Sequence, residues 1–334
     1  MTGDWGLETT QSQSRCIIRR MKRIILLSTL VTVGSLSLGV AAFQQPPANA
    51  PKVVEAQKLR DNLWMLTGQG GGGNTAVFVR SDGITVVDTK NPGWGQPILE
   101  AIKKLSDKPI TTIINTHTHG DHVSGNVEFP TTVEIIVQEN TKANMMEMRG
   151  ATGIAQTGPP TNIFKQNNGR GMPTRTYKDS LKVGKGADEV DLYYFGRGHT
   201  NGDSWVVFPA LHLVHAGDIF SGKNLPLLDA NNGGSALEIG KSLEKAAKSL
   251  KNIDTIITGH STTMTMADLR EYAAFNQEFM RDVQAGKKAG KKVDELAASW
   301  KIPAKYKGYT DPASTPQQTA RLKANMQIVF DETK

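Results

Sequence analysis

The stretch THTHGDHVSGN, from Thr116 to Asn126, constrains this chain more than any other part of it. Three of the chain's seven histidines and one aspartate fall within six positions there, at His117, His119, Asp121 and His122. Imidazole nitrogens and carboxylates are ligands that suit zinc, iron or manganese. A polar turn that happens to be rich in histidine is the plain alternative, and the density of ligand-type residues argues against it.

The residues around this motif predict how its side chains converge. The preceding run, ITTIINTH, is typical of a buried strand, and α/β proteins often place their chemistry at the carboxyl end of such a strand. His117 and His119 alternate along the chain, so both can face one point. Asp121 and His122 fall where the chain turns into a helix, so they can face a second point beside the first. The motif therefore predicts two adjacent metal positions.

Three later residues have the same character. His199 lies in the glycine-rich turn GRGHTNGDS, Asp218 follows the strand-like LHLVHAG, and His260 ends the strand-like DTIITGH. Because strand ends meet at one edge of a layered fold, we expect all three to join the first motif. The remaining histidines, His212 and His215, flank an apolar strand and are interpreted as surface or edge residues.

Short β-branched segments alternate with helical ones along the rest of the chain. Strands are expected at residues 62–68, 74–80, 84–90, 110–117 and 133–138, and helices at 95–106, 139–149, 235–250, 266–285, 294–300 and 315–331. Strands and then helices, in repeated blocks, indicate a layered α/β protein. The glycine-rich hairpin 68–74 is either a mobile flap over the site or a plain turn, and the irregular stretch 150–173 is typical of a lid or a disordered loop.

The first residues predict export. Residues 1–42 combine a basic cluster, an apolar run at 24–40 and small residues suited to cleavage, which is the pattern of a signal peptide. A retained membrane anchor is the alternative, but the run is short for a span. Residues 43–58 are interpreted as a Pro-rich linker, and Met21 competes with Met1 as the true start. We expect a periplasmic or secreted protein with no stable membrane span.

Charge and cysteine content limit which binding partners and which chemistry this chain can have. Residues 1–42 hold five of the 39 Lys and Arg and two of the 32 Asp and Glu, so the remainder carries only a net charge of +4. This mild excess does not indicate nucleic-acid binding and leaves a small-molecule substrate as the expected partner. The single cysteine, Cys16, lies before the apolar run. The exported chain therefore has no thiol for a disulfide, a nucleophile or a metal ligand.

With these residues in place, the chain resembles the metallo-β-lactamase fold superfamily. The resemblance rests on H-x-H-x-D-H at 117–122 followed in order by His199, Asp218 and His260. It implies an αββα sandwich of two mixed β-sheets with outer helices, forming a catalytic domain over residues 59–262. Residues 263–334 would then be a C-terminal helical extension packed on that domain.

The resemblance also implies a role for each site residue. His117, His119 and His199 would hold metal 1; Asp121, His122 and His260 would hold metal 2; Asp218 would bridge them; and Asp88, in VVDTK, would orient the metal-binding loop from behind. The cofactors would be two divalent ions, with zinc as the first choice and iron or manganese as alternatives. A hydroxide bridging the two ions would be the nucleophile, and Asp121 would be the catalytic residue that orients it.

The choice among superfamily members is less constrained. An aspartate at the bridging position points away from the true β-lactamases and toward the thioesterase, lactonase and phosphodiesterase branches. Phe220 and Ser221 stand where acyl-homoserine lactonases tend to place a tyrosine. Trp94 and Phe220 are candidates for the wall of the substrate pocket. We therefore expect a hydrolase of an ester, lactone, amide or thioester.

Two other functions stay open at this stage. A mononuclear iron oxidoreductase of the same fold, similar to the persulfide dioxygenases, would share the early motif. A non-catalytic metal-binding protein of the cell envelope is the third candidate. The substrate, the metal and the oligomeric state are not determined by the sequence.

Overall fold

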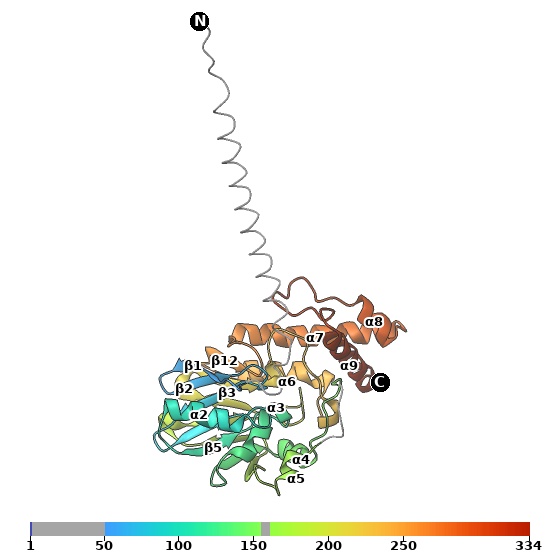
Figure 1. The fold of residues 1–334 in the computed structure, drawn as a ribbon. Coiled ribbons are helices and arrows are strands. Elements are labelled where there is room, and N and C mark those ends of the chain that lie inside the picture. The colour runs from blue at the N-terminus through green and yellow to red at the C-terminus, as the bar shows by residue number, and fades with distance from the viewer. Residues whose placement is uncertain (2–50, 155–160) are drawn as a thin grey trace. The chain divides into compact units, whose positions relative to one another are not determined.

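Two β-sheets carry the fold, and the computed structural model describes them through residues 51–154 and 161–334, together with Met1 (Figure 1). The first sheet has seven strands in the order β1-β2-β3-β4-β5-β6-β7. They are β1 (Glu55–Arg60), β2 (Leu63–Thr67), β3 (Thr75–Val79), β4 (Ile84–Val87), β5 (Ile110–Ile114), β6 (Glu134–Gln138) and β7 (Arg175–Tyr177). The pairs from β1 to β4 are antiparallel and those from β4 to β7 are parallel, so the sheet is mixed.

The second sheet has five strands in the order β12-β11-β10-β9-β8. They are β8 (Ser180–Val183), β9 (Val190–Tyr193), β10 (Trp205–Phe208), β11 (Leu213–Gly217) and β12 (Thr255–Thr258). The pairs from β8 to β11 are antiparallel, and β12 joins β11 in parallel. Both sheets are therefore mixed, as predicted.

Apolar side chains from the facing sheets form the inner core. Phe78 on β3 meets Phe208 on β10 edge to face, with ring centroids 5.1 Å apart. Leu63, Val87 and Ile257 are fully buried in the same cluster. Alternate residues of each strand point to this core, and the residues between them point to the outer layers.

Helices cover both outer faces, which completes the predicted αββα sandwich. The helix α2 (Gly95–Leu105) packs on the first sheet through Ile98 and Ile102. On the second sheet lie α6 (Ala236–Ser249), α7 (Met266–Lys288) and α9 (Pro316–Glu332), whose apolar faces share one buried cluster with β10 and β11 (Figure 1). Shorter helices are α3 (Gly120–Val123), α4 (Glu139–Glu147), α5 (Ile163–Gln166) and α8 (Val293–Ser299). Single 3₁₀ turns are η1 (Ser124–Glu128), η2 (Gly186–Asp188), η3 (Pro209–Leu211), η4 (Asp218–Phe220) and η5 (Ala230–Asn232).

The C-terminal helices are tied to the rest of the fold by specific contacts. Asn325 on α9 donates a hydrogen bond from Nδ2 to the carbonyl of Pro226 at 2.8 Å, and its Oδ1 accepts one from the amide of Leu228 at 3.4 Å. The Nε1 of Trp300 donates to Asp282 on α7 at 3.1 Å. The bonds of Asn325 hold α9 against the chain segment that follows β11, and the bond of Trp300 ties the end of α8 to α7.

The amino-terminal boundary differs from the expected linker. Strand β1 begins at Glu55, which pairs with Thr67 of β2, so the sheet starts inside the stretch 43–58. Backbone pairing, rather than apolar side chains, makes this strand, since most of its residues are exposed. The predicted signal peptide, residues 1–42, lies outside the described residues. Within the described part of the chain, no helix is long and apolar enough to cross a membrane.

Candidate metal centre

Four loops meet at one edge of the sandwich, each following a strand. The loop after β5 carries the histidine-rich motif, the loop after β9 carries His199, Asp218 directly follows β11, and His260 follows β12. Strands of both sheets therefore supply the site. All seven predicted ligands are brought together, and they fall into two groups.

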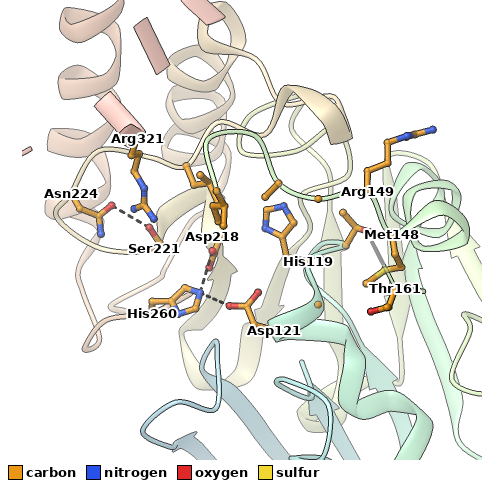
Figure 2. A pocket seen from close by; sticks show the side chains of 16 residues that line it. His119, Asp121, Met148, Arg149, Thr161, Asp218, Ser221, Asn224, His260 and Arg321 are labelled. Carbon is orange, nitrogen blue, oxygen red and sulfur yellow. Dashed lines mark hydrogen bonds and ion pairs between the residues drawn. The ribbon is translucent and has the colours of Figure 1, made fainter. Parts of the chain in front are cut away.

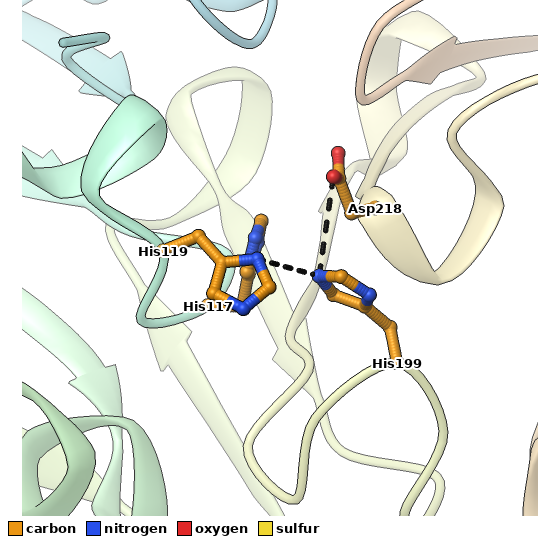
Figure 3. Close-up of side chains that lie close together, drawn as sticks. All are labelled: His117, His119, His199 and Asp218. Carbon is orange, nitrogen blue, oxygen red and sulfur yellow. Dashed lines mark hydrogen bonds and ion pairs between the residues drawn. The ribbon is translucent and has the colours of Figure 1, made fainter. Parts of the chain in front are cut away.

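The first group contains His117, His119, His199 and Asp218 (Figure 3). One ligand atom from each lies within 4.8 Å of the others, and all four residues are buried. The Nε2 of His199 is 3.0 Å from Nδ1 of His119. The Nε2 of His117 is buried and has no hydrogen-bond partner among the described residues. A buried nitrogen of this kind is costly unless something binds it.

The second group contains Asp121, His122 and His260, again with ligand atoms within 4.8 Å of one another. The Nε2 atoms of His122 and His260 are 3.2 Å apart, and Nε2 of His260 is 3.2 Å from Oδ2 of Asp121. Asp218 lies between the two groups. Its Oδ1 is 3.3 Å from Nε2 of His122, while its Oδ2 is 3.9 Å from Nε2 of His199.

Asp88 orients two of the histidines from behind. This fully buried carboxylate accepts hydrogen bonds from the amide and the hydroxyl of Thr116, at 2.8 and 2.7 Å. Its Oδ2 is also 2.7 Å from Nδ1 of His122, and the Thr116 hydroxyl is 3.0 Å from Nδ1 of His117. Because the outer nitrogens of both rings are engaged, the Nε2 atoms face the site. Asp88 is held at φ 62, a left-handed conformation that is costly for aspartate and is tolerated when such contacts fix it.

Asp229 has a similar position behind His119, and the sequence analysis missed it. Its Oδ2 is 2.7 Å from Nε2 of His119, which leaves Nδ1 of that ring to face the site. Its Oδ1 accepts from the amide and the hydroxyl of Thr152 at 3.0 and 3.1 Å. The carbonyl of Leu227, two residues earlier, engages Nδ1 of His199. An aspartate that opens the turn DANNGG is an ordinary turn signal, so local sequence does not separate it from a surface residue.

These residues fit divalent metal ions. The three histidines of the motif and His199 each have one ring nitrogen hydrogen-bonded to a group outside the two ligand groups. The other ring nitrogen of each faces the remaining ligand atoms. Such convergence of nitrogens and carboxylate oxygens is the arrangement that transition metals require, and outer partners of this kind fix the ring orientation. In a polar turn without metal, ring nitrogens would instead point to separate partners.

Burial and neighbouring charges shift histidine pKa values in opposite directions in the two groups. Burial, followed by the charge of His122, lowers the pKa of His117 well below its ordinary value. Burial and His119 likewise lower the pKa of His199 to about 4. Burial also acts against protonation of His260, but the carboxylates of Asp218 and Asp121 outweigh it and raise its pKa to about 9. Without metal, His117 and His199 are therefore neutral imidazoles, and His260 holds a proton between Asp218 and Asp121.

The glycine-rich hairpin 68–74 packs directly against Asp121 and His122. A Cβ at Gly73 would lie 2.1 Å from Cε1 of His122, and one at Gly72 would lie 2.5 Å from the carbonyl oxygen of Asp121. The amide of Gly73 donates to that same carbonyl at 3.1 Å, and Nζ of Lys90 donates to the Gly73 carbonyl at 2.5 Å. The sequence left a mobile flap and a plain turn as alternatives for this segment; in the structure its glycines permit close approach to the ligands.

A cavity of about 720 Å³ opens beside both ligand groups (Figure 2). Its walls come from the motif, from the segment after α4, from the segment after Asp218 and from α9: Thr118, His119, Gly120, Asp121, Met148, Arg149, Gly150, Ala151, Ile154, Thr161, Asp218, Ser221, Asn224, Leu227, His260 and Arg321. Four described residues of the irregular stretch 150–173 border this cavity: Gly150, Ala151, Ile154 and Thr161.

The two side chains suggested for the pocket wall lie elsewhere. Trp94 is buried against the hairpin, where a Cβ at Gly68 would meet its ring at 2.6 Å. Phe220 is fully buried and packs on Tyr272, with ring centroids 4.9 Å apart. Neither is among the described residues that line the cavity. Both aromatic rings are used for packing, since burying them stabilises the fold.

The interpretation of His215 as a surface or edge residue is also wrong. This residue lies on β11 and is fully buried, with Nε2 3.1 Å from the carbonyl of Asn74 and Nδ1 accepting from the amide of Gly217 at 3.1 Å. It joins the hairpin to the second sheet and takes no part in either ligand group. His212 is exposed, as expected.

Comparisons with known proteins agree with this architecture. A family model described as the metallo-beta-lactamase superfamily matches residues 68–260. A metallo-beta-lactamase type 2 from Elizabethkingia meningoseptica is 26% identical over 254 residues, which cover 73% of this chain and 89% of that protein. The metallo-beta-lactamase type 2 of Bacillus cereus is 23% identical over 221 residues, covering 64% and 78%. A solved metallo-beta-lactamase from Pontibacter korlensis has the same fold, with a TM-score of 0.53, 17% identity, and coverage of 67% of this chain and 99% of that one.

Proposed function

The chain belongs to the metallo-beta-lactamase superfamily, and from this premise we propose that it is a two-metal hydrolase of small acyl compounds. One observation carries the proposal: seven ligand-type side chains form two groups that meet at Asp218, on the wall of a cavity large enough for a small molecule. The substrates we propose are esters, lactones, amides or thioesters.

The chemistry needs groups that activate water and hold the acyl carbonyl. Divalent ions bound at the two groups would lower the pKa of a water molecule and polarise the carbonyl. The chain's own residues then set the geometry. Asp121 is half-exposed at the cavity wall, so its carboxylate can accept a hydrogen bond from the attacking water and orient it. Attack at the acyl carbon breaks the bond to the leaving oxygen, nitrogen or sulfur and yields a carboxylate product.

The position of Asp218 supports a shared centre rather than two separate sites. Both of its oxygens lie close to the second group, with Oδ1 3.3 Å from His122 and Oδ2 3.2 Å from His260, and Oδ2 is also 3.9 Å from His199 of the first group. A carboxylate offers two ligand oxygens, so it can bridge neighbouring cations. A mononuclear iron site would use the first group alone, and a metal buffer would need no shared carboxylate. The complete second group therefore favours the two-metal hydrolase.

Substrate choice and metal identity are the finer parts of the proposal. Zinc is the first candidate because histidine and aspartate suit it and it needs no redox partner. The aspartate at position 218 favours esters, thioesters and lactones, while the names of the relatives make β-lactams a necessary member of any test panel. We also propose that residues 1–42 direct export. The mass of the mature chain, measured on protein from the native compartment, would locate the cleavage.

Metal content is the first test of the proposed function. Elemental mass spectrometry on protein purified without added metal should find about two divalent ions per chain, and the metal-loaded protein should hydrolyse a member of an ester, thioester, lactone and β-lactam panel. Asp121→Ala should abolish turnover. Asp61→Ala is the matched control, because Asp61 only pairs with Lys58 on the surface. One iron per chain would indicate the oxidoreductase, and full activity of Asp121→Ala would exclude the mechanism.

A further inference from the structure

Arg321 belongs to the C-terminal extension yet reaches the cavity beside the metal centre (Figure 2). It lies on α9, and α7 and α8 separate this helix from the family match at residues 68–260. The next residue, Leu322, is buried in the outer core together with Met326 and Val329. This apolar face anchors the helix, so the side chain of Arg321 is turned toward the cavity by the packing of its own helix.

The guanidinium of Arg321 has no hydrogen-bond or ion-pair partner within residues 51–154 and 161–334. The side chain is half-buried, and burial lowers the pKa of Arg321, which Asp218 across the cavity only partly offsets. Arginine nevertheless stays charged in proteins. A half-buried cation without a partner costs free energy, so the position makes sense when an anion joins it.

The charges of the metal centre do not supply that anion. Five buried or half-buried carboxylates lie at or near the two ligand groups: Asp88, Asp121, Asp203, Asp218 and Asp229. Together with the buried ammonium of Lys90 they leave four negative charges. Two divalent cations would balance these four negative charges, since the histidines bind metal as neutral rings. The charge of Arg321 would then be in excess, because Asp218 would be held by the metal ions.

The position of Arg321 is also fixed relative to the ligands. Asn325, one helical turn further along α9, is bonded to the backbone at Pro226 and Leu228. The same short segment supplies the Leu227 carbonyl that engages His199 and the Asp229 carboxylate that engages His119. The loop at residues 226–229 therefore contacts both the metal-ligand histidines and the helix that carries Arg321. These contacts fix the distance between the guanidinium and the ligand groups before a substrate binds.

We propose that Arg321 binds a carboxylate of the substrate, so that the cavity selects acyl compounds carrying an acidic group beyond the scissile bond. This inference rests on the proposed function. The planar guanidinium offers two parallel donors to a carboxylate, a geometry that lysine cannot reproduce. Ser221 and Asn224 line the same side of the cavity and are joined by a 3.3 Å hydrogen bond, so they add polar groups at the edge of this anion site.

Thiol-bearing probes test the anion site without requiring turnover. Thiolates bind zinc directly, so mercaptoacetate, mercaptopropionate and mercaptobutyrate would place their carboxylates at three distances from the metals. Their primary amides are neutral controls of the same length. Calorimetric titration of the metal-loaded protein should show one acid bound about 10- to 100-fold more tightly than its amide, as expected for a hydrogen-bonded charge pair.

Variants assign the preference to one side chain. Arg321→Gln should remove the preference for the acid while leaving binding of the amide unchanged, and Arg321→Lys should retain part of it. Lys323→Gln is the matched control: it removes a positive charge from the same helix, where Lys323 pairs with Asp294 at 2.7 Å. That variant should keep the full preference. A thermal melt of each variant separates loss of binding from loss of folding.

The outcomes distinguish this inference from the proposed function. If thiols bind but acids and amides bind equally, or if Arg321→Gln keeps the preference, the anion site is refuted and the metal centre stands. If Lys323→Gln loses as much preference as Arg321→Gln, general charge rather than a specific contact is responsible, which also refutes it. If no thiol binds and no metal is taken up, the metal centre itself is refuted, and the anion site with it.

Discussion

Asp229 provides the sharpest test of how this site is held together. In Asp229→Asn the amide oxygen can still accept a hydrogen bond from Nε2 of His119, but the negative charge behind the ring is lost. A carboxylate in that place makes the imidazole a better ligand, and loss of such a partner typically weakens metal binding about 10- to 100-fold. This corresponds to about 1.4 to 2.8 kcal/mol. Because Asp229 contacts only the first ligand group, we expect weaker binding of the metal ion held by that group and unchanged binding of the other.

A larger change at the same position should affect folding as well. Asp229→Ala leaves Nε2 of His119 and both donors of Thr152 without their acceptor in a fully buried place. Leaving buried donors without their acceptor costs about 1 to 3 kcal/mol. We therefore expect Asp229→Asn to fold with a small loss of stability and Asp229→Ala to lower the free energy of unfolding by that amount.

The assay is competition for zinc with a chromophoric chelator, which resolves two stepwise affinities. Asp188→Asn is the matched control, because Asp188 also accepts several hydrogen bonds, from the amide and hydroxyl of Ser81, but lies on the surface away from the site. The control should bind both metals as the unmodified protein does. Unchanged affinities in a folded Asp229→Asn protein would refute the role assigned to this carboxylate, and so would an equal loss in the control.

Four further predictions rest on the same structure. Gly73→Ala should reduce metal content from about two ions to one, measured by elemental mass spectrometry, because the added Cβ would lie 2.1 Å from the ring of His122. Metal uptake should release protons, and calorimetry in buffers of different ionisation enthalpy should detect it, since Asp218 and Asp121 overcome burial and raise the pKa of His260 to about 9. The raised pKa of His260 also predicts that the free energy of unfolding of the metal-free protein falls as pH rises from about 6.5 through 9, because folded His260 loses its proton over that range. A urea midpoint that does not change over that range would contradict this. Phe208→Ala should lower the free energy of unfolding by about 3 to 5 kcal/mol in urea, because it removes a ring from the core between the sheets.

The order of elements and the metal-ligand candidates could be predicted from short stretches of sequence. The helix expected at 315–331 is observed as Pro316–Glu332, and the helix expected at 266–285 begins at Met266. Apolar periodicity and capping residues are local properties, so they predict such elements well. The seven candidate ligands were found because each follows a strand, and strand ends converge in any layered α/β fold.

Other features depend on contacts between distant segments. The glycines of the hairpin were compatible with a mobile flap or a plain turn, yet they are required by the approach of Asp121 and His122, about 50 residues away in sequence. His215 looked like an edge residue because its strand has an apolar pattern on either side, but the hairpin covers it. Trp94 and Phe220 looked available for a pocket because large aromatic side chains serve packing and binding equally well.

The sequence by itself therefore determined the ligand types, their order and the layered architecture, since these follow from spacing and periodicity. Only the tertiary structure decided that Asp229 supports His119 across 110 residues and that Arg321 enters the cavity from the last helix. Neither residue has a local signature, because an aspartate in a turn and an arginine on a helix are common surface features. Their roles arise from tertiary packing, which places each charged side chain beside residues that are distant from it in the sequence.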